Sequence, residues 1–252
     1  GNCMGRKCPT HDICFYQRSR RKMERANLLI CNHAVFFSDL ALRARGFGYL
    51  PRYDHVILDE AHMVEDVASE HFGVSLTEGR VNHLLSALFV ERGAKGYLAN
   101  LSTAVSDTTP VEAAIRLVRE ARDAAGAFFE ALAIWRSTPG TSPGGRVREP
   151  GVTDNIIGPV FQQLAVALRA LREFAIQEAD KLELNAYAER ASEIADAAEI
   201  LITQSLDGCA YWVEVTGGRA GGMRSRVGIA CSPVEVAPLL REHLFTGESA
   251  AS

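Results

Sequence analysis

A strand–helix–strand pattern near the N-terminus constrains the fold more than any other feature of the sequence. Residues 27–32 (NLLICN) form a nearly continuous apolar run, which is typical of a strand buried on both faces. Residues 34–45 have helical spacing of apolar side chains, and residues 56–58 (VIL) begin a second apolar run. Two strands joined by a helix within this length form a parallel, right-handed βαβ unit. The sequence therefore predicts an α/β fold with a parallel sheet.

Polar residues follow both predicted strands: Asn-His at 32–33 and Asp-Glu-Ala-His (DEAH) at 59–62. Ligands gather at the carboxyl ends of parallel strands. Two adjacent carboxylates suit a nucleotide hydrolase, in which one holds magnesium and the next orients and deprotonates water. We therefore predict Asp59 at the magnesium, Glu60 as the base and His62 as the phosphate sensor. An acidic helix start is the alternative, but it does not account for the apolar run before it.

Three cysteines lie close together at the N-terminus, in the pattern Cys3-x4-Cys8-x5-Cys14. Zinc sites more often use closer Cys couplets, whereas three thiolates at these spacings can wrap a cubane iron–sulfur cluster and leave one iron without a ligand. A fourth cysteine is then expected upstream of Gly1. His11 could replace it, although an exposed loop histidine is the simpler interpretation. The scattered cysteines, Cys31, Cys209 and Cys231, are predicted to be small apolar core residues.

The first thirty residues are basic, whereas the rest of the chain is acidic. Residues 1–30 hold seven basic and two acidic residues, a balance of +5, and the whole chain carries −4, so the remainder carries −9. This asymmetry predicts a local contact with a polyanion; a solvated helix face is the alternative. Residues 15–26 are predicted to form a basic helix. No apolar run reaches the ~18 residues of a membrane span, so no membrane contact is expected.

The composition of the sequence changes after residue 76, where long stretches rich in Ala, Leu, Glu and Arg begin. Amphipathic helices are predicted at 78–91, 110–136, 155–178 and 180–206, with a flexible Pro/Gly-rich loop at 137–155. A hairpin is then predicted, with strands at 210–215 and 227–231 around a glycine-rich turn (Gly217, Gly218, Gly221, Gly222). A short helix is predicted to follow at 234–245.

The cysteine spacing, the basic segment, the apolar run ending in Asn-His-Ala and the DEAH box, in this order, resemble the DinG/XPD-type superfamily 2 DNA helicases. Residues 211–214 (YWVE) and 232–236 (SPVEV) resemble the return into the first motor domain of that family. The resemblance is specific over 1–65 and 208–245 and loose over 76–206. Bacterial DinG-like proteins fit better than the eukaryotic repair members, because of the cysteine spacing.

The resemblance implies a partial RecA-like P-loop motor domain with a parallel sheet, an N-terminal iron–sulfur segment and a mainly α-helical arch insertion. The chain would be an internal piece of a longer protein. The expected divisions are a partial cluster segment at 1–26, part of the first motor domain at 27–75, the arch-like insertion at 76–207, and the truncated return strands and helix of the motor domain at 208–252.

The resemblance also implies cofactors and partners. A 4Fe–4S cluster would be held by Cys3, Cys8 and Cys14 with the upstream cysteine, and ATP with Mg²⁺ would bind at Asp59 and Glu60. The activity would be ATP-driven 5′-to-3′ translocation on single-stranded DNA, acting on forked or displaced-strand DNA in repair or replication, by a monomer at the bacterial nucleoid in the cytoplasm. Single-strand grooves combine positive charge with stacking surfaces. The candidate DNA-contacting residues are Phe15, Tyr16, Arg18, Arg20, Arg21, Lys22, Arg25, Asn32 and His33.

Two parts of such a motor are missing from these residues. No Gly-x-Gly-Lys-Thr phosphate loop occurs, and there is no second motor domain. We therefore expect the chain alone to be inactive. A non-enzymatic, zinc-stabilised nucleic-acid-binding module, with an incidental DEAH, is the alternative of a different class. A nuclease-fused or RNA-directed relative with the same motor also stays open.

Overall fold

The computed structural model describes residues 3–43, 46–217 and 226–245. The chain divides into two compact units, one formed by Val74–Cys231 and the other by Cys3–Gly73 together with the residues from Ser232 onward. Within the described residues, no helix is both long and apolar enough to cross a bilayer.

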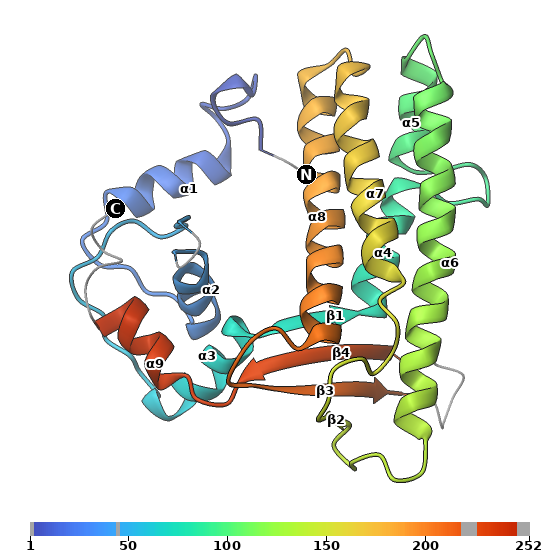
Figure 1. The fold of residues 1–252 in the computed structure, drawn as a ribbon. Helices are drawn as coiled ribbons and strands as arrows, with labels where there is room; N and C mark the ends of the chain where they lie inside the picture. The colour runs from blue at the N-terminus through green and yellow to red at the C-terminus, as the bar shows by residue number, and fades with distance from the viewer. Residues whose placement is uncertain (1–2, 44–45, 218–225, 246–252) are drawn as a thin grey trace. The chain divides into compact units, whose positions relative to one another are not determined.

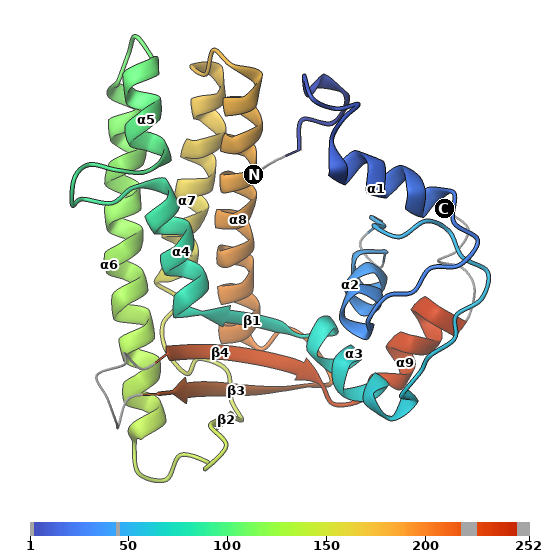
Figure 2. The same cartoon turned by 180° about the vertical axis from the view of Figure 1, so that it is seen from behind.

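The larger unit consists of helices standing on a small sheet (Figures 1 and 2). Amphipathic spacing accounts for its long helices: α6 buries Val111, Val118, Phe128 and Leu132 on one face. Helix α7 packs against α6 and α8. The elements are β1 (Val74–Thr77), α4 (Glu78–Leu88), α5 (Tyr97–Ala104), α6 (Thr109–Ser137), β2 (Arg146–Val147), α7 (Ile157–Ala170), the 3-10 turn η3 (Leu171–Glu173), α8 (Glu178–Thr203), β3 (Cys209–Thr216) and β4 (Arg226–Pro233).

The sheet has four strands in the order β1-β4-β3-β2. Strand β1 pairs antiparallel with β4, with Val74 opposite Cys231, and β2 pairs antiparallel with β3, with Val147 opposite Tyr211. The predicted hairpin strands are therefore present as β3 and β4, while the predicted turn residues Gly218, Gly221 and Gly222 lie outside the described residues. Within the 137–155 segment, predicted to be a flexible loop, residues 146–147 form the edge strand β2.

The smaller unit is built around an apolar core shared by the three helices α2 (His33–Arg43), α3 (Val64–Phe72) and α9 (Ala237–Leu240). Phe37 and Leu40 of α2 are fully buried, and Ala68 of α3 and Leu240 of α9 pack with them. The elements are the 3-10 turn η1 (Gly5–Lys7), α1 (Phe15–Glu24), α2 (His33–Arg43), the 3-10 turn η2 (Ala61–Met63), α3 (Val64–Phe72), α9 (Ala237–Leu240) and the π-helical turn η4 (Arg241–Phe245).

The two predicted parallel strands are not found. Residues 27–32 and 56–58 have no regular structure, and Ile30 and Ile57 are 92% and 93% exposed. A strand is stabilised by the backbone hydrogen bonds of a neighbouring strand, and neither segment has such a neighbour among the described residues. Cys31, predicted to be a core residue, is exposed for the same reason. What the described residues form is a mixed α/β structure with an antiparallel sheet.

Candidate nucleotide and nucleic-acid sites

The DEAH residues are exposed at the start of η2: Asp59 and Glu60 precede this 3-10 turn, and Ala61 and His62 are its first two residues. The backbone N–H of Glu60 donates to Asp59 Oδ1 at 3.0 Å, and Glu60 Oε2 lies 3.3 Å from His62 Nδ1. Both of the latter side chains are exposed, at 69% and 72%. The three predicted catalytic residues are thus adjacent, with their polar atoms available to a ligand.

Glu60 has an unusual backbone conformation, with φ 47° and ψ 49°. This left-handed region costs a non-glycine residue roughly 1–2 kcal/mol, and Glu is not among the residues that adopt it readily. Strained residues of this kind cluster at functional sites. The backbone strain therefore indicates that Glu60 is a candidate functional residue, independently of the DEAH motif.

Asn32 and His33 lie at the start of α2. The side chain of Asn32 accepts the backbone N–H of Val35 at 2.9 Å, which is the hydrogen bond of a helix N-cap. The His33 ring lies edge-on to Phe37, with ring centroids 6.2 Å apart. The described hydrogen bonds and ion pairs join Asn32 to its own helix but not to the DEAH residues. The predicted meeting of Asn32-His33 and the DEAH residues at one edge of a parallel sheet is therefore not found among the described residues.

The three N-terminal cysteines are free thiols, Cys3 being exposed and the other two half-buried. Cys3 Sγ accepts hydrogen bonds from Gly5 N at 3.4 Å and Gln17 Nε2 at 3.2 Å. Cys8 Sγ lies 3.3 Å from Thr10 Oγ1, and the hydrogen bonds from Thr10 lower the pKa of the Cys8 thiol.

Thiolates are the ligands that soft metal sites and iron–sulfur clusters use, so the chemistry of these cysteines fits a metal centre. Their positions, however, do not form such a centre. Among the residues that the structure describes, no three potential ligands converge on one point. His11, the possible replacement ligand, is instead half-buried, with Nδ1 3.3 Å from Asp12 Oδ1.

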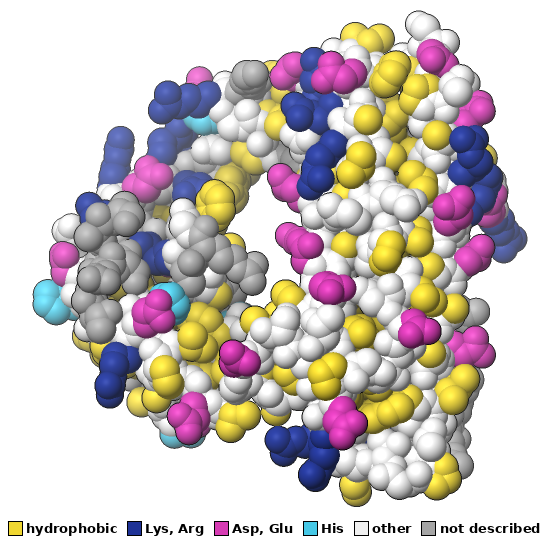
Figure 3. Space-filling view, viewed as in Figure 1, with side chains coloured by type: hydrophobic (Ala, Val, Ile, Leu, Met, Phe, Trp, Pro, Cys, Tyr) yellow, Lys and Arg dark blue, Asp and Glu magenta, His cyan; other side chains and the backbone are white. Residues whose placement is uncertain are grey.

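The basic helix α1 has two distinct polar faces, and none of its residues is buried. Basic side chains gather over this part of the surface (Figure 3). A shallow pocket of about 320 Å³ is lined by Asp12 and four basic residues of one face, Arg18, Arg21, Lys22 and Arg25.

On the other face of α1, Arg20 is already engaged. Its Nη1 lies 3.5 Å from the Tyr16 hydroxyl, and its guanidinium carbon lies 5.3 Å from the centroid of the Tyr49 ring. The candidate DNA-contacting residues of this helix therefore divide into an open basic face and a face that contacts residue 49.

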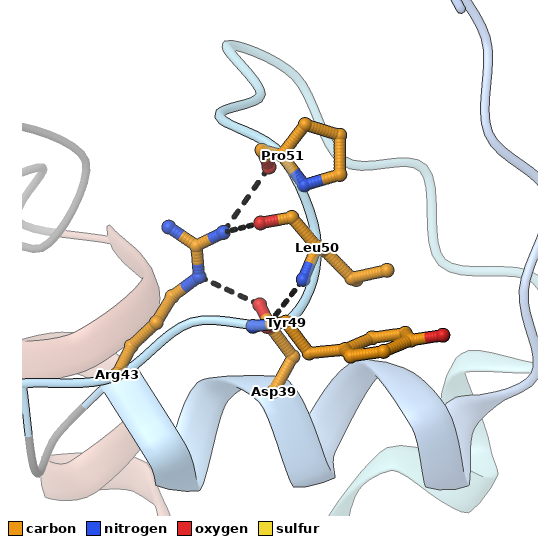
Figure 4. Close-up of polar contacts among 5 residues, drawn as sticks. All are labelled: Asp39, Arg43, Tyr49, Leu50 and Pro51. Atoms are coloured by element: carbon orange, nitrogen blue, oxygen red, sulfur yellow. Dashed lines mark hydrogen bonds and ion pairs between the residues drawn. The ribbon is translucent and has the colours of Figure 1, made fainter. Parts of the chain in front are cut away.

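A buried ion pair holds the segment before the DEAH box against α2 (Figure 4). The Asp39 carboxylate, 1% exposed, accepts Arg43 Nε at 2.6 Å and the backbone N–H groups of Tyr49 and Leu50. Arg43 Nη2 donates to the carbonyls of Leu50 and Pro51 at 2.6 and 3.1 Å. This pair was not predicted from the sequence, although an Asp and an Arg four residues apart in a predicted helix are a recognisable signal.

Comparisons with known proteins match the part of the chain that contains these sites. A protein-family profile described as DEAD_2 matches residues 4–81, which include α1, the DEAH box and two of the three N-terminal cysteines. The ATP-dependent DNA helicase YoaA of Haemophilus influenzae is 28% identical over 223 residues, 87% of this chain and 32% of that protein. YoaA of Escherichia coli K12 is 35% identical over 124 residues, 48% of this chain and 18% of the relative. The chain is homologous to DinG/XPD-type helicases.

The chain is also similar to a protein that is named DinG. The protein named 3′-5′ exonuclease DinG of Bacillus subtilis 168 is 35% identical over 78 residues, 31% of this chain and 8% of that protein. The chain thus spans about a third or less of these curated relatives. The resemblance to DinG/XPD-type helicases predicted from the residues is confirmed, and the DEAD_2 match lies mainly in the smaller unit with the DEAH box.

Proposed function

We propose that this chain is part of an ATP-dependent DNA helicase that moves 5′-to-3′ on single-stranded DNA and opens forked or displaced-strand DNA. It would act as a monomer at the bacterial nucleoid, in repair or replication. The observation that carries the proposal is the DEAH turn within the DEAD_2 region, with Glu60 held in a strained conformation beside Asp59 and His62. The names of the YoaA relatives support the same activity.

In the proposed site, ATP and Mg²⁺ bring the reacting phosphate, and this chain provides the groups around it. Asp59 would hold the metal, since hard cations prefer carboxylate oxygens. Glu60 would take the proton of the attacking water, and His62, whose Nδ1 lies 3.3 Å from Glu60 Oε2, would sense the phosphate.

The test uses the full-length protein with Glu60→Gln, which removes the proton acceptor but preserves size. ATP binding should persist while DNA-stimulated hydrolysis is lost. Glu70→Gln, at an exposed glutamate of α3, is the matched control and should hydrolyse ATP at the parent rate. Unchanged turnover in Glu60→Gln would remove Glu60 from the base role.

For DNA we propose that the open face of α1 contacts the phosphate backbone. Four cationic side chains line one pocket there, whereas Arg20 and Tyr16 contact each other and Arg20 also contacts Tyr49. Removing one phosphate-binding cation reduces the steepness of log K against log salt by about 0.7 for single-stranded DNA. Arg21→Ala and Lys22→Ala should each show that decrease, while Arg116→Ala, on the exposed side of α6, should not. Equal slopes for all three would contradict the proposal.

We further propose that Cys3, Cys8 and Cys14 hold a 4Fe–4S cluster together with a ligand from elsewhere in the full-length protein. Their free thiols and the hydrogen bonds to the Cys3 and Cys8 sulfurs support a ligand role. Anaerobically purified protein should then absorb near ~400 nm and contain about four irons per chain. Stoichiometric zinc without iron would instead favour the second candidate function, a zinc-stabilised nucleic-acid-binding module.

The fold of the full-length protein follows the same proposal. Residues 27–32 and 56–58 would become strands of a RecA-like parallel sheet, because Leu28, Ile30 and Ile57 expose most of their apolar surface in this chain. The helical unit would be the arch-like insertion. Hydrogen exchange on the full-length protein tests the strands: amides of 28–31 should be protected as strongly as those of β3, and rapid exchange there would contradict the assignment.

A further inference from the structure

The ring of Tyr49 joins the basic helix α1 to the segment that precedes the DEAH box. The guanidinium carbon of Arg20 lies 5.3 Å from the centroid of this ring, within the distance of about 6 Å at which a cation–π interaction forms. None of the residues of α1 is buried, so no apolar side chain anchors this helix in a core. The position of α1 therefore depends on surface contacts such as the one between Arg20 and Tyr49.

The backbone of Tyr49 is held on its other side by α2. Its N–H donates to Asp39 Oδ1, and the N–H of Leu50 donates to the same oxygen at 2.7 Å. The Asp39 side chain is 0% exposed and paired with Arg43, so these two hydrogen bonds are shielded from water. Figure 4 shows the Tyr49 ring pointing away from the ion pair. Tyr49 therefore contacts α1 through its ring and α2 through its backbone.

The segment that leads from Tyr49 to the DEAH box is anchored at two further residues. The centroid of the Tyr53 ring lies 5.9 Å from that of the Phe36 ring in α2 and 5.2 Å from the guanidinium carbon of Arg43. Leu58, the last residue before the DEAH box, packs against the apolar core of α2, α3 and α9. A segment anchored along its length transmits a displacement of its first residues, whereas a loose loop would absorb it.

We propose that Tyr49 is a positioning residue that couples DNA binding at α1 to ATP hydrolysis at the DEAH box. The inference rests on the proposed helicase function and adds to it the residue that joins the two sites. DNA on the open face of α1 shifts this helix, and the contact between Arg20 and Tyr49 passes the shift to α2 and to the segment before Asp59. The two positions of α1, with and without DNA, thus correspond to two settings of the DEAH box.

ATP turnover of the full-length protein, measured without DNA and at saturating single-stranded DNA, tests this coupling. Tyr49→Ala should lower the DNA-saturated kcat by about two- to fivefold, the factor that a cation–π contact at an exposed site accounts for. The DNA-free turnover and the salt dependence of DNA binding should equal those of the parent protein, because Tyr49 contacts neither ligand. Tyr49→Phe keeps the ring and should retain the full stimulation by DNA.

Phe47→Ala is the matched control, since Phe47 lies in the same loop and is 72% exposed. It should be stimulated by DNA as strongly as the parent protein. An equal loss of stimulation in Phe47→Ala and Tyr49→Ala would assign the effect to a loosened loop and overturn the coupling role. A lower DNA-free turnover in Tyr49→Ala would likewise overturn it, because Tyr49 would then support the DEAH box itself.

The failure of this inference is distinguishable from that of the proposed function. A parent protein whose ATP turnover does not respond to DNA would overturn both. A parent protein that DNA stimulates, together with a Tyr49→Ala variant stimulated to the same degree, would overturn the coupling role alone.

A double variant tests whether the coupling passes through the contact with Arg20. At saturating DNA, Arg20→Ala should lower the stimulated kcat about as much as Tyr49→Ala does. The combined variant should lose no more than either single variant, because both substitutions remove the same contact. Arg20→Lys keeps a cation over the ring and should preserve most of the stimulation. Losses that multiply in the double variant would show that the two residues act separately, and would exclude the proposed link.

Discussion

Arg43 follows Asp39 by one turn of α2, and its Nε lies 2.6 Å from the Asp39 carboxylate in a site where the two side chains are 13% and 0% exposed. The pair also fixes the chain that follows, through the backbone groups of Leu50 and Pro51 (Figure 4). Removing one partner of a buried ion pair leaves the other charge uncompensated, which costs about 3–5 kcal/mol. We expect Asp39→Ala to lower the free energy of unfolding by that amount, measured by urea denaturation.

The exposed ion pair Arg80–Glu193 is the control for this measurement. Its atoms lie 2.9 Å apart, but the side chains are 43% and 61% exposed, and surface pairs contribute only about 0–1 kcal/mol. Glu193→Ala should therefore have a small effect. Equal losses in the two variants would mean that the Asp39 site is open to water and does not fix residues 49–51.

The contrast between α6 and residues 27–32 explains how far the sequence could predict this fold. The apolar positions of α6, from Val111 to Leu132, repeat along one helix face, and that local pattern predicted the helix to within one residue at either end. Leu28 and Ile30 are also apolar, but whether they form a strand depends on partners that no local pattern specifies. The short helix α5 was missed because its eight residues contain too few turns for a clear period.

The candidate site was predictable to a similar degree. The DEAH motif predicts Asp59 and Glu60 as site residues from residue types alone, and their roles stay a prediction. The left-handed backbone of Glu60 could not be predicted, because Glu normally avoids that region. The spacing of Asp39 and Arg43 was readable as a helical pair. Their contacts with Leu50 depend on the path of a loop, and loops follow tertiary contacts more than local propensity.

The strain at Glu60 gives a second testable expectation. Asn tolerates the left-handed region better than Glu does, so Glu60→Asn should raise the free energy of unfolding by roughly 0.5–1 kcal/mol while removing the proposed base. The same change at Glu65, in the first turn of α3, should instead lower stability by roughly 0.5 kcal/mol, because Asn is a poorer helix former. Thermal melts of both variants check the pair. Destabilisation by Glu60→Asn would show that the Glu side chain is held there by contacts that outweigh the strain.

The alkaline stability of the helical unit should depend on Tyr97. Its hydroxyl donates to the backbone carbonyl and Oδ1 of Asp180, both at 3.2 Å, and burial, then the Asp180 charge, raises its pKa. The unfolded chain, with an ordinary tyrosine pKa of about 10, then loses this proton first. Stability from Tyr97 is complete below that pH and falls as the pH rises above it.

Melting temperatures at about pH 8 and pH 10.5, either side of the ordinary tyrosine pKa, check this sign. At the lower pH, Tyr97→Phe should be less stable than the parent protein by about 0.5–1.5 kcal/mol, because one hydrogen bond is missing. Between the lower and the higher pH, however, its stability should fall by less than that of the parent protein. Tyr16→Phe, at an exposed tyrosine of α1, should follow the parent. A parallel decline in all three proteins would exclude Tyr97 as a source of the alkaline loss.

Gly145 and Gly151 offer a matched test of the sheet edge. Both have positive φ, 69° and 79°, so alanine costs about 1–2 kcal/mol at either position for its backbone conformation. Only at Gly145 would the new Cβ overlap a backbone atom, the carbonyl oxygen of Val213 in β3; at Gly151 it would meet nothing within 4 Å. The Gly145 carbonyl also accepts the Val213 N–H at 2.9 Å, so the backbone cannot move away without losing that bond. Gly145→Ala should therefore be the more destabilising variant by about 1–3 kcal/mol, the usual cost of overpacking, in urea denaturation. Equal losses would mean that β2 does not pack against β3 as closely as this register requires.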